Sequence, residues 1–182
     1  MVTGIWRDPP LIYKLTYMKK DKNQIDQRFF IESAAFLLRE TFEGSPAGQG
    51  SAYLDNGVGF FNTVDGLSAE AASGRFWGTT VAAQTEHSKF YLDRICEFLN
   101  GRTEKVNWDD SWLIESVNDD EWAALRSSFR QSYENTLRCV AAIDKWDEPR
   151  VGMAIGLIAH TAYHLGAIRQ IAKSMRSADG EK

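Results

Sequence analysis

Two histidines stand four residues apart in an otherwise apolar stretch of the chain, IAHTAYHLGAIRQIA. His160 and His164 are two of only three histidines among the 182 residues. Residues i and i+4 project from one face of a helix, close enough for two imidazoles to bind one ion. A buried histidine is more often a core residue satisfied by a hydrogen bond. The spacing alone therefore leaves metal binding and core packing open.

The third histidine, His87, lies in an earlier segment that also has helical periodicity. Its main apolar stripe comprises Trp77, Val81, Leu92, Ile95 and Leu99, and His87 lies on the flank of that stripe. His160 and His164 lie within a stripe of the later segment, together with Met153, Leu157, Ile168 and Ile171. All three histidines can therefore face one interior, where His87 would supply a third ligand from an adjacent helix.

The elements that position these residues are all predicted to be helical. Helices are expected over residues 24–42, 67–101 with a break near Gly74, 119–146 and 150–175. Residues 44–66 are rich in glycine but hold large apolar side chains, which predicts a long connection packed over the fold. No alternating strand pattern is present. The sequence thus predicts an all-α four-helix bundle with a long connection between its first two helices.

Length and composition limit the class of protein. An N-terminal arm at 1–24, one bundle at 25–176 and a tail at 177–182 are expected, with 43% apolar residues overall. The net charge of -4 argues against nucleic-acid binding. Cys96 and Cys139 form no CxxC motif and are expected to be core thiols, which fits a reducing cytoplasm. No signal peptide or run of membrane-spanning length is expected.

Several motifs resemble the DinB-like superfamily, which includes the YfiT-type metal-dependent hydrolases and thiol transferases. They are EH at 86–87, NWDDSW at 107–112, HTAYHLGAIRQ at 160–170 and the connection from YLDNGVGFF onward. The resemblance extends from residue 26 over most of the chain. It implies a DinB/YfiT-like four-helix bundle, often dimeric, that holds zinc or nickel through His87, His160 and His164. It does not identify the substrate, because members use different thiols and electrophiles.

These observations lead to two functional hypotheses. Three neutral ligands leave coordination positions open for water or substrate, as in catalytic metal sites. The first hypothesis is therefore a metal-dependent enzyme that activates water or a low-molecular-weight thiol, as a hydrolase or S-transferase acting on a small molecule. The second is a non-catalytic dimeric module that binds a metal or ligand.

Residues near the expected site have less specific roles. Tyr91, one helical turn from His87, is the candidate for a catalytic hydroxyl, although core packing explains it equally well. Arg94 could hold an anionic substrate, but pairing with a carboxylate is the favoured role. Glu86 is expected to lie in solvent instead of acting as a general base. NWDDSW is expected to pack its tryptophans against the bundle end, with Asp109 or Ser111 making turn or cap hydrogen bonds.

Overall fold

The computed structural model describes residues 25–46, 48 and 50–180, with side chains up to residue 175. Within these ranges the chain forms helices and no strand: α1 (Gln27–Glu43), α2 (Phe60–Asp65), α3 (Ala69–Ser73), α4 (Val81–Leu99), the 3-10 helix η2 (Trp108–Trp112), α5 (Asp119–Ala141) and α6 (Glu148–Gly180). The predicted all-α class is confirmed. The arm predicted at 1–24 and residues 181–182 of the predicted tail lie outside the described residues.

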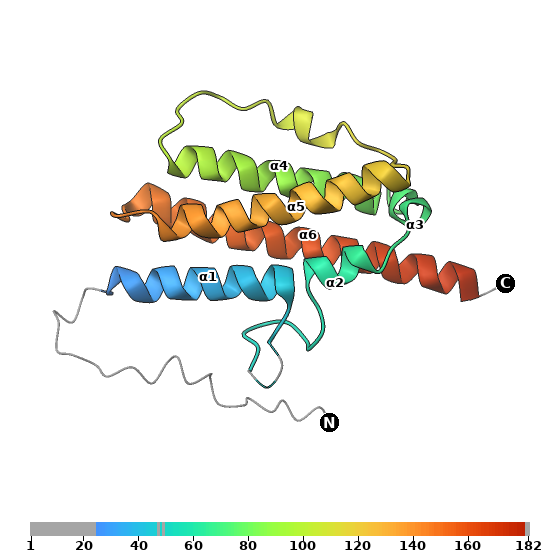
Figure 1. The fold of residues 1–182 in the computed structure, drawn as a ribbon, viewed down its shortest axis with the longest axis horizontal. Helices are drawn as coiled ribbons and strands as arrows, with labels where there is room; N and C mark the ends of the chain where they lie inside the picture. Colours follow the sequence, from blue (N-terminus) through green and yellow to red (C-terminus); the bar gives the residue numbers. More distant parts are fainter. Residues whose placement is uncertain (1–24, 47, 49, 181–182) are drawn as a thin grey trace.

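The four long helices α1, α4, α5 and α6 lie side by side (Figure 1). α4 packs on both α5 and α6, and α1 packs on the same two helices from another side. Each contributes fully buried apolar side chains, among them Phe42, Leu92, Phe129 and Leu157. Burial of such a side chain stabilises the fold by about 1.5–3 kcal/mol. The core therefore runs along the common axis of these four helices.

The long connection after α1 packs onto the fold, as the sequence predicts, and it contains one short helix. Phe60 and Phe61 of α2 are buried against Phe42 of α1 and Phe129 of α5, with ring centroids 4.9–5.9 Å apart. A Cβ atom on Gly59 would lie 2.6 Å from the backbone nitrogen of Gly44. Only a residue without a Cβ atom permits the two ends of the connection to approach so closely.

The structure divides the predicted second helix into two helices, α3 and α4. The break lies near Gly74, as expected. α3 ends there, and residues 76–79 make a tight turn in which Trp77 has a φ of 49° and Gly78 a φ of 81°. Trp77 is 74% exposed, so its assignment to the apolar stripe was wrong. α4 begins afresh because the Thr80 side chain accepts a hydrogen bond from the Ala83 backbone N–H.

The third long helix ends earlier than the sequence predicts. α5 runs to Ala141, although apolar residues continue at helical spacing to Trp146. The chain instead turns back, and the Trp146 ring packs edge-on against Phe30 of α1 at 4.9 Å. Asp147 then accepts a hydrogen bond from the Arg150 backbone N–H, and Pro149 occupies the first turn of α6, where its missing N–H costs nothing.

α6 is the most apolar helix and continues five residues beyond its predicted end at Met175, to Gly180. Within Glu148–Met175 a window of the helix has a mean hydropathy of 1.4. By length and composition alone, this helix is long and apolar enough to cross a membrane. The expectation that no run has this length was therefore wrong. Because α6 packs on α1, α2 and α4, its hydropathy also suits a central packing helix.

Candidate metal centre

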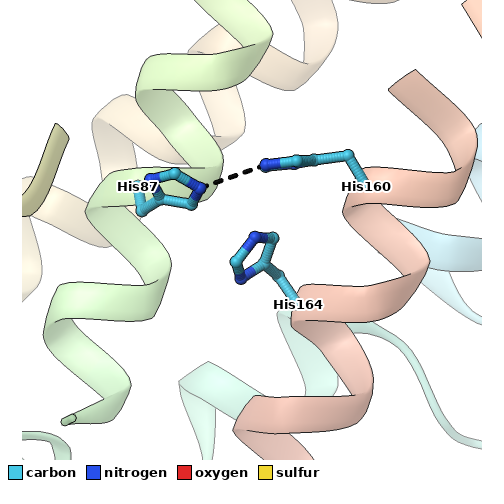
Figure 2. A group of neighbouring side chains, drawn as sticks. All are labelled: His87, His160 and His164. Atoms are coloured by element: carbon cyan, nitrogen blue, oxygen red, sulfur yellow. Dashed lines mark hydrogen bonds between the residues drawn. The ribbon is translucent and has the colours of Figure 1, made fainter. Parts of the chain in front are cut away.

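The three histidines converge between α4 and α6, as Figure 2 shows. The Nε2 atoms of His87 and His160 lie 3.1 Å apart. One ligand nitrogen from each of His87, His160 and His164 lies within 4.8 Å of the others. A tetrahedral ion with metal–nitrogen distances of about 2.0–2.1 Å needs ligand nitrogens separated by about 3.4 Å. The three-histidine cluster can therefore hold a metal ion after small side-chain adjustments.

Ser111 of η2 determines which ring nitrogen of His87 carries the proton. Ser111 is fully buried, and its hydroxyl donates to the backbone carbonyl of Trp108 at 2.6 Å. Its oxygen can then only accept from the ring nitrogen Nδ1 of His87, 2.7 Å away. The His87 proton consequently resides on Nδ1, and the Nε2 lone pair is directed at the cluster.

Gln84 has the same effect on His164. The carbonyl oxygen of the Gln84 side chain lies 2.6 Å from Nδ1 of His164, while its amide nitrogen donates to the Thr79 hydroxyl. His164 must therefore donate through Nδ1 and present a bare Nε2. Two of the three candidate ligands are thus held in the tautomer that metal coordination through Nε2 requires.

His160 is held by stacking instead of by a hydrogen bond. Its ring lies flat on Tyr91, with centroids 3.6 Å apart and planes 8° from parallel. Because His87 Nε2 carries no proton, the 3.1 Å contact requires His160 Nε2 to donate. His160 Nδ1 is buried and has no partner among the described residues. A cation bound by the Nε2 atoms would replace the hydrogen bond between His87 and His160, and the His160 proton would then reside on Nδ1.

Burial keeps the cluster uncharged at neutral pH. Burial, followed by the neighbouring His87, lowers the pKa of His160 to about 4. Burial, followed by His160 and His87, lowers the pKa of His164 to about 3, and burial also lowers the pKa of His87. Neutral imidazoles are the form that binds metal, so an ion need not displace protons from a charged site near pH 7.

The segment that carries Ser111 is fixed to the bundle beyond η2. The Thr80 hydroxyl donates to the backbone carbonyl of Glu115 at 3.1 Å, and Ser73 bonds both the N–H and the carbonyl of Val117. Trp112 stacks on the His87 ring with centroids 3.9 Å apart. These contacts hold η2 over His87, so NWDDSW contributes to the site. Its tryptophans lie against His87, Phe90 and Tyr91 within α4, so the expectation that they pack against the bundle end was wrong.

Tyr91 lies behind His160. A Cβ atom on Gly156 would be 3.6 Å from the Tyr91 hydroxyl oxygen, and Gly156 is one turn before His160 on α6, on the side away from His164. The ring therefore supports a candidate ligand, and no contact brings its hydroxyl to the cluster. A catalytic hydroxyl on Tyr91 stays a prediction.

Arg94 has the expected structural role, and Glu86 does not. Arg94 pairs with Glu97 at 2.5 Å, as predicted. Glu86 lines a cavity of about 500 Å³ with Lys89 and Ile114, apart from the histidines. Its side chain is only 21% exposed, so the expectation of a solvated glutamate was wrong, and burial raises its pKa.

Sequence reasoning missed Gln84 and the contact of Ser111 with His87. Gln84 precedes His87 by three positions and so shares its helix face, a signal that was present in the sequence. Ser111 is 24 residues from His87, and only the folding of η2 onto α4 brings the two together. A polar residue between two tryptophans gave no specific indication of this contact.

Comparison with known proteins adds no relative to this picture. No protein-family model, no curated protein and no solved structure matches the chain.

Proposed function

We propose that this protein is a metal-dependent enzyme whose ion, zinc or nickel, is held by His87, His160 and His164. The observation that carries the proposal is the fixed tautomer of two ligands, because Ser111 and Gln84 direct bare Nε2 atoms at one point. A divalent ion with three neutral ligands would lower the pKa of water or a thiol at a further position and supply a nucleophile at neutral pH. Hydrolysis or S-transfer of a small molecule is the proposed reaction class.

The chain's own residues would orient the ligands and restrict access. Trp112 covers one face of His87 and Tyr91 covers one face of His160, so both imidazoles are confined to a narrow range of ring orientations. Trp108 packs near Tyr91, with ring centroids 5.7 Å apart. These aromatic rings exclude water from the sides of the cluster and leave the open coordination position as the point where a small-molecule substrate enters.

We further propose that the protein is a DinB-like, YfiT-type four-helix bundle that acts in the cytoplasm as a homodimer. Support comes from the four side-by-side helices and the grouping of the motif histidines. On α6, the exposed residues Gly152, Ile155, Ala159 and Tyr163 form one stripe that no described residue covers fully. An exposed apolar helix stripe next to the metal-binding helix is a suitable dimer surface.

Thiol-dependent turnover tests the proposal. Untagged, zinc- or nickel-loaded protein would be incubated with electrophilic and ester substrates, with and without low-molecular-weight thiols. We expect turnover that requires metal and disappears in His160→Ala. Tyr91→Phe keeps the stacked ring, so unchanged activity in this variant would assign Tyr91 to support, and a large fall in kcat would assign it a catalytic hydroxyl.

The second candidate function is a non-catalytic module that binds a metal or ligand. The cavity of about 500 Å³ lined by Glu86, Lys89 and Ile114 includes none of the three histidines, so a ligand bound there would not meet the metal. Full metal occupancy with no turnover across the substrate and thiol panel would support this alternative.

A further inference from the structure

The two cysteines, far apart in sequence, meet between α4 and α5. The Cys139 thiol lies 3.7 Å from the backbone carbonyl oxygen of Cys96 and donates to it in its protonated form. The Cys96 thiol donates to Thr136, one turn before Cys139 on α5, at 3.4 Å. The sequence offers neither cysteine a neighbouring thiol, and the packing of α4 on α5 brings the two residues together.

The polar surroundings of the two sulfur atoms differ. The side-chain amide of Asn100, the residue that ends α4, approaches Cys139 Sγ at 3.6 Å and can donate to a thiolate there. Cys96 instead lies beside the Thr136 hydroxyl. Hydrogen bonds from Cys96 and Asn100 lower the pKa of Cys139 to about 7. A hydrogen bond with Cys139, together with burial, raises the pKa of Cys96.

We propose that Cys96 and Cys139 form a reversible disulfide when the protein meets a hydroperoxide, with Cys139 as the attacking thiolate and Cys96 as the resolving thiol. The geometry carries the proposal: α4 and α5 pack together, the Cys139 sulfur lies 3.7 Å from the backbone carbonyl oxygen of Cys96, and the Cys96 sulfur lies 3.4 Å from Thr136, one turn before Cys139. Rotation of the two side chains would then bring the sulfur atoms toward the bond length of about 2.05 Å. Both residues are partly accessible, and a hydroperoxide such as hydrogen peroxide is small enough to reach them.

The reaction proceeds in two steps. The Cys139 thiolate attacks one peroxide oxygen, the O–O bond breaks, and Cys139 becomes a sulfenic acid as hydroxide leaves. Cys96 then loses its proton and attacks the Cys139 sulfur, the S–O bond breaks and water departs. In total, two thiols and hydrogen peroxide give one disulfide and two waters.

The bond would connect the two helices on either side of η2. Residues 97–138 would become a closed loop that contains Ser111, the hydrogen-bond partner of His87. Closing a loop restricts the unfolded chain, so the oxidised protein should melt at a higher temperature than the reduced protein. The inference does not rest on the proposed enzymatic activity.

Peptide mapping of peroxide-treated, full-length protein tests the proposal. Trypsin cleaves after Arg94, Arg102, Arg138 and Lys145, so the disulfide joins peptides 95–102 and 139–145. We expect this linked pair in wild type under non-reducing conditions and its loss after dithiothreitol. In Cys96→Ser we expect a sulfenic acid at Cys139, trapped by dimedone. In Cys139→Ser the Cys96 thiol should remain reduced.

Rate measurements separate the two thiols. Asn100→Ala removes the amide donor and should slow the oxidation of Cys139 severalfold at neutral pH, while Asn135→Ala, an exposed change on α5, should leave the rate unchanged. Circular dichroism confirms that each variant is folded. Recovery of both wild-type peptides as free thiols after excess peroxide would overturn the proposal. Oxidation of Cys96 in Cys139→Ser as fast as that of Cys139 in wild type would overturn the assigned roles.

Discussion

At the residue scale, the chemistry of the molecule depends on the histidine ring nitrogens. It also depends on the groups that hydrogen-bond to the ring nitrogens facing away from the cluster. The i, i+4 spacing of His160 and His164 and the flank position of His87 predicted that the three could meet, and the structure brings them together. The same spacing did not predict which nitrogen of each ring would be bare. That property depends on Ser111 and Gln84, and the contact of Ser111 with His87 arises only in the folded chain.

The supporting hydrogen bonds should therefore tune metal affinity. Ser111→Ala and Gln84→Leu remove the acceptors that hold His87 and His164 in the required tautomer, and we expect each to weaken metal binding about 10–100-fold. Calorimetric or competitive titration with zinc and nickel measures the change. Gln84→Glu retains an acceptor and should recover most of the affinity.

Ser88→Ala is the matched control, because Ser88 is a fully buried serine on α4, the helix of His87. Its hydroxyl donates a hydrogen bond to the backbone carbonyl of Gln84. Its metal affinity should equal that of wild type. If Ser111→Ala binds metal as tightly as Ser88→Ala, the hydrogen bond to His87 does not orient the ligand.

At the scale of elements, periodicity predicted where helices lie better than where they end. The pattern predicted four long helices but extended one of them through Trp77. There, a turn with positive φ at Trp77 and Gly78 separates two helices. It extended another to Trp146, which packs on Phe30 from a non-helical turn. A residue at helical spacing can be buried without belonging to a helix, so apolar periodicity alone cannot locate a chain reversal.

The connection between α1 and α2 is fixed by one buried carboxylate. Glu40 is 1% exposed and accepts hydrogen bonds from the backbone N–H groups of Ala52, Tyr53 and Leu54 at 2.7–3.0 Å. Glu40→Ala would leave these donors without their acceptor, and we expect a loss of about 3 kcal/mol in the free energy of unfolding. Urea denaturation measures this loss.

The exposed change Glu32→Ala on the same helix serves as the control and should alter the free energy of unfolding by less than about 0.5 kcal/mol. Equal effects of the two substitutions would show that the connection holds its position without Glu40. Sequence reasoning predicted that this connection packs onto the fold, but not its anchor, because a glutamate in an amphipathic helix usually faces solvent.

The whole molecule was predicted as an all-α fold, and the structure confirms the helical class. α6 is apolar on most sides because it serves several surfaces: it packs on α1 and α4, contributes two histidines and leaves Ile155 and Tyr163 exposed. Composition could not separate these demands from membrane insertion.

The metal-free protein should lose stability as the solution becomes acidic. Below about pH 6.5 the histidines of the unfolded chain bind protons. Folded His160 and His164 do not bind them until the pH approaches about 4 and about 3. Because the unfolded state then binds more protons, the free energy of unfolding falls as pH falls through this window. Urea denaturation in chelator between about pH 7.5 and 4.5 measures the slope.

His164→Gln removes one of these groups and should give a shallower dependence on pH than wild type, whatever its effect at neutral pH. Ser88→Ala should keep the wild-type slope. Parallel curves for wild type and His164→Gln would contradict the assignment of a low pKa to His164 in the folded chain.

Metal stoichiometry tests the central claim most directly. Wild type, His160→Ala and Ser88→Ala would be produced without a polyhistidine tag, exposed to equal zinc or nickel, desalted and analysed by elemental mass spectrometry. Three converging neutral imidazoles predict about one tightly held ion per chain in wild type and Ser88→Ala, and almost none in folded His160→Ala. Wild-type protein that retains no more metal than His160→Ala would contradict the existence of the site.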